Sequence, residues 1–485
     1  MLRDVKSTVS DGQLGFATAT GDGQHIKIGV SPVESDVPIA ITKDMNAATI
    51  KSRLGLSPLA DATMDAVQFG ASRVFCIPVK AATPGTVGEV KKEGGESGGT
   101  LTVEGTPTNA FGVIVRITAQ GGLNTAAFAV SIDGGYTYTD EFTVPVSGSY
   151  ALEGTGLTLK FAEAAAEDQK PSSFLVGDSF AFTTTAPTMT NGEVLAAVEK
   201  VKNFSEEFEF VHVVGESALP LWQAMDEAQK ELFATYHKPA FILFEATYPE
   251  VPANGDLTEW ALQMEADRKK VKNYNIQVCT AWGRLVRLDG STQVVNLAGL
   301  ASGLYARAPV HESIGKTRPE AGYGISKLRL LELVPAGYDS SIIELLDVAG
   351  YLTFRQYDGL EDFFVYHTQM MSPNGSDFRY AEDVRVLNKV VRETRKEGLQ
   401  FINDDIDLED IQGELEARAK FLFVPLQRMI DAQEISGAEI TVPEGQEQTF
   451  LETETMSVKV RYLSRGYIRE VDIDIGRAAP RTEGG

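Results

Sequence analysis

At 485 residues the chain is too long for one ordinary core, and its 43% of hydrophobic residues is enough to bury two to four domains. The net charge of -24 argues against a nucleic-acid partner, because phosphate binding needs a cationic surface. No apolar run approaches the roughly 18 residues of a membrane span, and the first ten residues lack the apolar region of a signal peptide. We therefore expect no membrane insertion and a chain that is made and folded in a cytoplasm.

Residues 1–31 hold few core-like side chains until Ile26, Ile28 and Val30, which alternate with polar residues or glycine as a short strand. The mixture of Gly, Asp, Ser and Thr before them is typical of a floppy terminus, or of an arm that folds onto another molecule. We expect residues 1–31 to form an N-terminal extended arm.

An α/β pattern occupies residues 32–87 and resumes over residues 187–367. The first part predicts a strand at 38–41, helices that begin near Asn46 and Pro58, and a buried strand at 71–78. The second part holds three helix–strand repeats and then a small-residue helix over 294–307. Such repeats predict a largely parallel sheet with both faces covered.

Between these two parts, residues 88–186 have almost no helical periodicity, and short alternating runs recur at the spacing of a β-sandwich or barrel. Asp133, Gly134 and Gly135 form the clearest hairpin turn signal in the chain. We predict an all-β domain inserted into a loop of a discontinuous α/β body.

Residues 368–463 predict a C-terminal α+β domain: a long helix, an acidic turn, a second helix and a strand. In that strand Met456, Val458, Val460 and Tyr462 alternate with polar residues. Residues 464–485 follow as a linking strand and tail, in which Val471, Ile473 and Ile475 alternate with Glu470, Asp472 and Asp474. The fold class is thus α/β (α+β) multidomain, ending in extended strands.

Recognised catalytic signatures such as GxSxG, a Walker loop, HExxH or CxxC do not occur. Cys76 and Cys279 lie in apolar runs, where a thiol behaves as a small buried hydrophobe, and His212 reads as a sheet residue. The acidic run at Asp405 and Asp407 spaces roughly like a calcium loop, but Asp410 stands where that loop needs Gly, which favours a helix N-cap at Asp407. We predict no catalytic residue, no cofactor and no metal.

Three segments and the order of the parts resemble the tail sheath proteins of contractile phage tails and related injection systems. The segments are DGQHIKIGVSP at 22–32, VVNLAGLASGLYARAPVHESIGKTRP at 294–319, and FRYAEDVRVLNKVVRETRKEGLQFI at 378–402, which begins near Arg379 and Tyr380. The chain departs from the family before the last long helix, where many sheath proteins carry a Trp-Gly-Ala-Arg-Thr-like segment. Here YHTQMMSPNG lacks both the Trp and the Arg.

This resemblance implies a structural subunit that polymerises into a helical sheath, with rings of six, around an inner tail tube protein, and that meets baseplate and tail terminator proteins. It implies inter-subunit strands at Ile26, Ile28, Val30, Tyr467, Arg469, Val471, Ile473 and Ile475, and a receiving strand at Met456, Val458, Val460 and Tyr462. The final segment is locally basic, which suits an acidic neighbour, although such charges also keep an exposed edge solvated. An α/β enzyme with an accessory β domain and a surface-layer or adhesin protein remain as alternatives.

Overall fold

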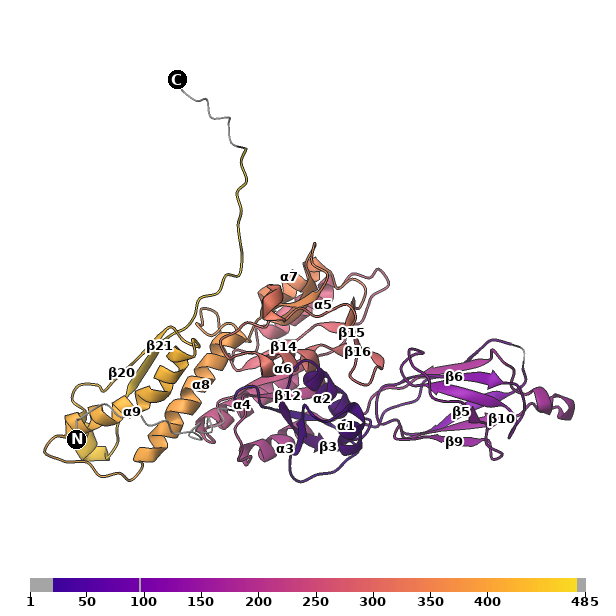
Figure 1. The fold of residues 1–485 in the computed structure, drawn as a ribbon, viewed down its shortest axis with the longest axis horizontal. Coiled ribbons are helices and arrows are strands. Elements are labelled where there is room, and N and C mark those ends of the chain that lie inside the picture. Colours follow the sequence, from indigo (N-terminus) through magenta and orange to yellow (C-terminus); the bar gives the residue numbers. More distant parts are fainter. Residues whose placement is uncertain (1–20, 96, 478–485) are drawn as a thin grey trace, which may run out of the picture. The chain divides into compact units, whose positions relative to one another are not determined.

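The computed structural model describes residues 21–95 and 97–477, which divide into two compact units at residues 393 and 394 (Figure 1). The division falls inside helix α8 (Ala381–Gly398). The first unit contains the α/β body and the inserted β domain, and the second contains the remaining C-terminal elements.

An eight-stranded sheet forms the centre of the body, in the order β19-β18-β14-β13-β12-β1-β3-β2. Neighbouring strands are parallel except at the two edges, where β2 and β19 run antiparallel, so the predicted largely parallel sheet is confirmed. In chain order the strands are β1 (His25–Val30), β2 (Ile39–Thr42), β3 (Arg73–Val79), β12 (Phe210–Ser217), β13 (Phe241–Ala246), β14 (Ile276–Cys279), β18 (Leu352–Gln356) and β19 (Phe363–Thr368).

The prediction of an N-terminal arm is wrong for β1. Ile26 and Ile28 are fully buried, Val30 is 5% exposed, and the strand pairs with β12 on one side and β3 on the other. The alternating polar positions His25 and Lys27 suggested a solvated face, but both side chains are buried as well. Because both edges of β1 are already paired, it cannot serve as an inter-subunit strand. Residues 1–20 of the predicted arm lie outside the described residues.

Helices cover both faces of this sheet, as predicted. Helices α2 and α6 pack on one face and α3 and α4 on the other (Figure 1). The helix expected over 294–307 begins only at residue 298, because the β-branched Val294 and Val295 belong to a strand of a separate sheet, ordered β16-β15-β17. The bounds are α1 (Ala47–Leu54), α2 (Pro58–Gln68), α3 (Asn191–Lys202), α4 (Leu219–Ala234), α5 (Thr258–Arg268), α6 (Ala298–Arg307), α7 (Ser340–Ala349), β15 (Trp282–Val286), β16 (Thr292–Asn296) and β17 (Leu330–Val334).

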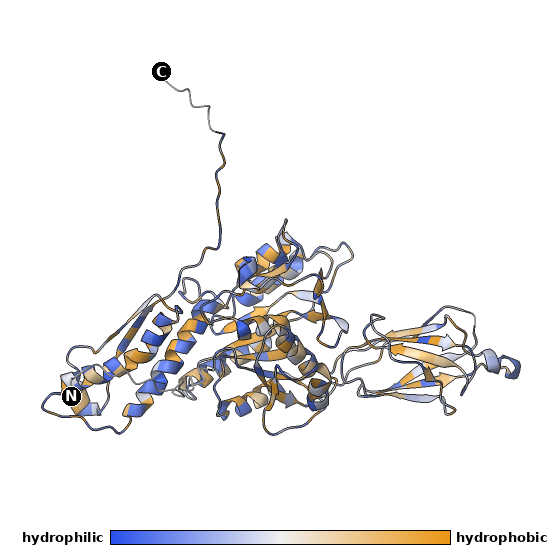
Figure 2. Cartoon of the chain, in the orientation of Figure 1, coloured by the Kyte–Doolittle hydropathy of each residue, from blue (hydrophilic) through white to orange (hydrophobic). Residues whose placement is uncertain are grey.

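The inserted domain is a two-sheet sandwich rather than a barrel. Its antiparallel sheets, β5-β10-β9 and β4-β11-β6-β7-β8, share one apolar core, and hydrophobic residues colour much of their strands in Figure 2. Gly134 and Gly135 take positive φ angles of 79° and 96°, so the predicted turn is present, but the returning strand begins only at Phe142. The strands are β4 (Lys91–Glu93), β5 (Thr100–Gly105), β6 (Gly112–Ala119), β7 (Ala127–Ser131), β8 (Phe142–Thr143), β9 (Ser149–Leu152), β10 (Leu157–Ala162) and β11 (Ser179–Thr183).

The second unit contains the end of α8, α9 (Ile411–Asp431), β20 (Gly437–Thr441), α10 (Gln446–Thr453) and β21 (Lys459–Leu463). The N-cap of α9 is Asp410, whose carboxylate accepts from the Gly413 amide at 3.1 Å. The predicted N-cap at Asp407 is therefore wrong. The Asp407 carboxylate instead accepts from the Glu409 amide, 2.9 Å away, in the preceding turn.

Candidate assembly site

The predicted receiving strand forms half of a two-stranded sheet in the second unit. Strand β21 contains Val460 and Tyr462 and pairs antiparallel with β20, while Met456 and Val458 precede it. The four side chains are half-buried and the residues between them are exposed, which matches the predicted two-residue period. Within the described residues this sheet consists of β20 and β21.

The predicted linking strand is not assigned to any sheet. Residues 464–477 contain no helix or strand, and Val471, Ile473 and Ile475 are 70%, 71% and 87% exposed. The Arg469 guanidinium lies over the Tyr467 ring, 4.8 Å from its centroid. Three exposed β-branched side chains at alternate positions form an apolar row, which is the pattern that a strand buries when it joins a sheet.

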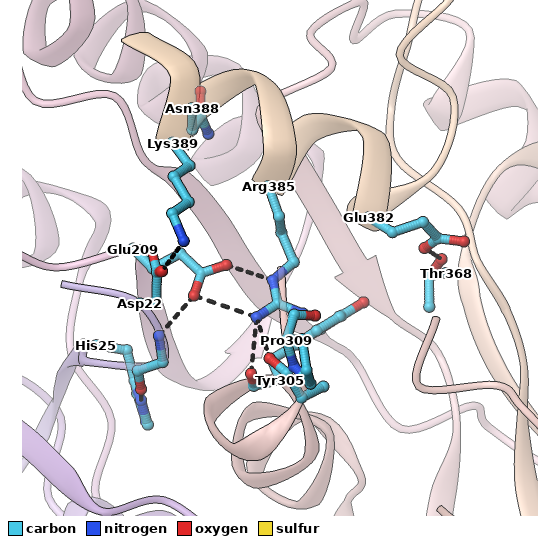
Figure 3. Close-up of polar contacts among 12 residues, drawn as sticks. Asp22, His25, Glu209, Tyr305, Pro309, Thr368, Glu382, Arg385, Asn388 and Lys389 are labelled. Atoms are coloured by element: carbon cyan, nitrogen blue, oxygen red, sulfur yellow. Dashed lines mark hydrogen bonds and ion pairs between the residues drawn. The ribbon is translucent and has the colours of Figure 1, made fainter. Parts of the chain in front are cut away.

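A cluster of polar side chains, which we call the helix anchor, holds the start of helix α8 against the body (Figure 3). Its members are Asp22, Glu209, Arg385, Lys389 and Arg392. Arg385, at the centre of this helix anchor, is fully buried and forms two hydrogen bonds to the Glu209 carboxylate, which is also fully buried. Nη2, one of the two nitrogens that bond Glu209, also lies 2.9 Å from the carbonyl oxygens of Tyr305 and Ala308, and Nη1 donates to the Pro309 carbonyl at 3.3 Å. A buried ion pair of this kind is stable only when its other hydrogen-bonding positions are also satisfied, as they are here.

The same anchor fixes the entry into β1. The Glu209 carboxylate accepts from the Gly23 amide at 2.7 Å, and Asp22 pairs with Lys389 at 2.5 Å and Arg392 at 2.9 Å. Gly23 has a φ of +73°, and a Cβ there would lie 2.1 Å from the carbonyl oxygen of residue 306 in α6. Any other residue at position 23 would be strained and would clash with the backbone of α6.

The helix anchor brings together the three segments on which the family resemblance rests, at residues 22–32, 294–319 and 378–402. The sequence analysis singled out Arg379 in the third segment, which donates to the Gln369 side chain at 3.2 Å, and it missed Arg385. A signal was present: Arg385, Lys389 and Arg392 follow the i, i+4, i+7 spacing of one helix face. That spacing does not indicate which acidic residues the face will meet.

The described residues include no group of three or more His, Cys, Asp or Glu side chains arranged to hold a metal ion. Cys76 and Cys279 are buried and unbonded to each other, in β3 and β14. None of the helices in the described part of the chain is long and apolar enough to span a bilayer.

Comparison with solved structures identifies sheath proteins of the same fold. A chain of the contracted sheath complex of the extracellular contractile injection system PVC aligns with a TM-score of 0.53 and 10% identity, covering 99% of each chain. A chain of the contracted anti-feeding prophage baseplate gives 0.54 and 11%, covering 98% of this chain and 97% of that one. The sheath tail protein of Desulfitobacterium hafniense gives 0.49 and 14%, covering 91% and 93%. At these identities the likeness to the first two chains, whose TM-scores are above 0.5, establishes the fold.

No curated protein matches the chain in sequence. Two family descriptions do match it: the DUF2586 N-terminal domain over residues 2–367 and the DUF2586 C-terminal domain over residues 377–482. Together these matches cover nearly the whole chain, which is therefore a member of the DUF2586 family with the fold of contractile tail sheath proteins.

Proposed function

We propose that this protein is a structural, non-enzymatic subunit of a contractile tail sheath. The observation that carries the proposal is the likeness, over 99% of the chain, to a sheath in its contracted state. In this role the chain polymerises into a helical tube with rings of six around an inner tail tube, and meets baseplate and tail terminator proteins at the ends. The particle is assembled in the bacterial host cytoplasm.

The link between subunits runs through the C-terminal segment. The apolar row of Val471, Ile473 and Ile475 from one subunit pairs with β21 in a neighbour. Main-chain hydrogen bonds then supply affinity, and the alternating side chains set the register. The exposure of these three side chains in the single chain supports this role. Pairing with a neighbour would remove their apolar surface from water, which stabilises the contact.

Contraction is a rearrangement of subunits rather than a chemical step. Head-to-tail contacts between identical subunits build an open helix, and such a helix changes pitch when body contacts change while flexible links persist. The helix anchor supports this distinction between a firmly attached helix and a flexible link. It fastens α8 to the body through buried charges, whereas the side chains of Val471, Ile473 and Ile475 are exposed.

Electron microscopy of the chain expressed alone and together with its tube protein tests the proposal. Hollow, regularly striated tubes are expected from the full chain, and soluble subunits without long tubes from a chain that ends at Leu463. A triple variant Val471→Ser, Ile473→Ser, Ile475→Ser should behave like the truncation. The matched triple variant Glu470→Ser, Asp472→Ser, Asp474→Ser, on the opposite side, should still form tubes. Long tubes from the truncated chain would exclude this segment as the link.

A further inference from the structure

The two-stranded sheet β20-β21 has an apolar and a charged face, because side chains alternate along a strand. On β21 the half-buried Val460 and Tyr462 share the first face, and the exposed Lys459 and Arg461 share the second. The charge of the second face differs between the strands, since Glu439 of β20 lies directly opposite Arg461 and is also exposed. β21 therefore presents two cations, and β20 presents an anion.

The C-terminal segment 467–475 has the same two-residue period with the opposite charge. Three apolar side chains alternate in it with three carboxylates, and all six are exposed. The apolar ones are Val471, Ile473 and Ile475, and the carboxylates are Glu470, Asp472 and Asp474. The charged side of this segment is thus complementary to the charged face of β21.

Burial of the apolar row determines which side chains the carboxylates meet. When the segment pairs with β21 of a neighbour, its apolar side chains take the face of Val460 and Tyr462, since a slip by one residue would expose them all. The carboxylates then lie on the face of Lys459 and Arg461, whether the strands run parallel or antiparallel. Opposite charges at cross-strand positions attract and like charges repel. Pairing with β20 would instead bring the carboxylates beside Glu439.

We propose that Lys459 and Arg461 of β21 select the C-terminal segment of a second copy of this chain through its carboxylates. The assignment rests on the proposed sheath function and adds to it the side chains that decide which strand of the neighbour is used. Charges on an exposed face contribute more to specificity than to affinity, which comes mainly from apolar burial and main-chain hydrogen bonds. Replacing the carboxylates by serine therefore leaves tubes intact, whereas a reversed charge blocks pairing.

Charge reversal in two full-length variants tests the selection. The β21 variant carries Lys459→Glu and Arg461→Glu, and the segment variant carries Glu470→Lys, Asp472→Lys and Asp474→Lys. Each variant alone places like charges across the contact, so the protein concentration needed for sedimentable tubes should rise about tenfold or more. An equal mixture of the two should form tubes near the wild-type concentration, because the acidic segment of one chain then meets the cations of the other, and the reverse.

Salt and a matched control complete the test. In about 1 M salt, where charges are screened beyond about 3 Å, each variant alone should again form tubes. Lys80→Glu with Lys91→Glu reverses two exposed cations of the first unit and should leave assembly unchanged. All reversed positions are exposed, so both variants should keep the wild-type urea midpoint.

The outcomes separate this assignment from the sheath function on which it rests. Wild-type assembly by the β21 variant, or no gain when the two folded variants are mixed, would overturn the assignment. Tubes formed by the chain that ends at Leu463 would overturn the C-terminal link itself, and the assignment with it. If that shortened chain forms no tubes while both charge variants assemble normally, only the role of Lys459 and Arg461 fails.

Discussion

Strand β1 and the C-terminal segment 467–475 have the same two-residue apolar period but opposite environments. Ile26 and Ile28 are fully buried between two paired strands, whereas Ile473 and Ile475 are 71% and 87% exposed. The period identifies which side chains share a face of a strand. It does not determine whether that strand lies at the centre of a sheet or remains available to a partner.

The polar positions of the two segments account for the difference. In β1, His25 stacks on the Phe210 ring at 4.5 Å, and Lys27 contacts His212 and Ser302, so both faces of the strand are covered. In the C-terminal segment Glu470, Asp472 and Asp474 are exposed. A strand becomes central when its polar side chains also find buried partners, because an unpartnered buried charge is too costly.

The largest expected effect is a charge placed in the core of β1. Ile28→Asp should cost more than about 4 kcal/mol in the free energy of unfolding, because the carboxylate would be buried without a cation. We expect insoluble or unfolded protein, measured as soluble yield and by urea denaturation. The control Ile28→Val removes a single methyl group and should cost about 1 kcal/mol. A soluble Ile28→Asp protein with the wild-type urea midpoint would contradict the central placement of β1.

The next effect concerns the helix anchor beside β1. Arg385→Met leaves the buried Glu209 carboxylate without its cation and should cost about 3–5 kcal/mol of unfolding free energy. In Glu209→Met protein the added cost of Arg385→Met should be much smaller, since no carboxylate is then left unpaired. Lys269→Met removes an exposed pair with Glu265 on α5 and should change stability by less than about 0.5 kcal/mol. Urea denaturation of all four variants measures these differences, and equal costs for Arg385→Met and Lys269→Met would contradict the anchor.

Local sequence signals predicted most of the elements. Helix–strand repeats, the turn at Gly134 and the helix starts near Asn46 and Pro58 depend on residues a few positions apart, and the structure contains the corresponding elements. The errors arose where the deciding interaction is distant in sequence. Lys27 contacts His212, 185 residues away in the sequence. This buried contact belongs to a central strand, where we expected an arm.

The candidate site was predictable only in part. The alternation in β21 was visible because it is local, and the half-buried positions of Val460 and Tyr462 confirm it. The helix anchor was visible only as a basic face of the helix at Arg385, because its acidic partner Glu209 is 176 residues away in the sequence. The assignment of 467–475 to a neighbouring subunit stays a prediction, since the structure contains a single chain.

The pH dependence of stability should distinguish buried carboxylates of the central sheet from exposed carboxylates of the C-terminal segment. Burial raises the pKa of Glu245 to about 7 from 4.5, so the folded protein retains a proton that the unfolded chain has lost. This contribution to stability is complete below about pH 4.5 and is lost as the pH rises through 7. The lowered pKa of His212 acts in the opposite direction, so the comparison must be made between variants.

Glu245→Gln removes the titrating group. Between pH 4.5 and 8 the wild-type protein should lose on the order of 2 kcal/mol more unfolding free energy than this variant. Asp472→Asn, at an exposed carboxylate of the C-terminal segment, should leave the pH profile unchanged. Urea denaturation across this pH range gives the profiles. Parallel wild-type and Glu245→Gln profiles would show that Glu245 titrates normally in the folded protein.

The smallest expected effect on the single chain is in the exposed C-terminal segment. Ile473→Asp should change the unfolding free energy of dilute, unassembled subunits by less than about 0.5 kcal/mol, because the side chain is 71% exposed and leaves no cavity. The same substitution should prevent sedimentable tubes, since pairing with a neighbouring β21 would bury the new charge. Asp472→Ser, on the opposite side of the segment, should affect neither measurement. A loss of more than about 1 kcal/mol in Ile473→Asp subunits would mean that this isoleucine packs within its own chain, and the contrast with β1 would then be one of degree.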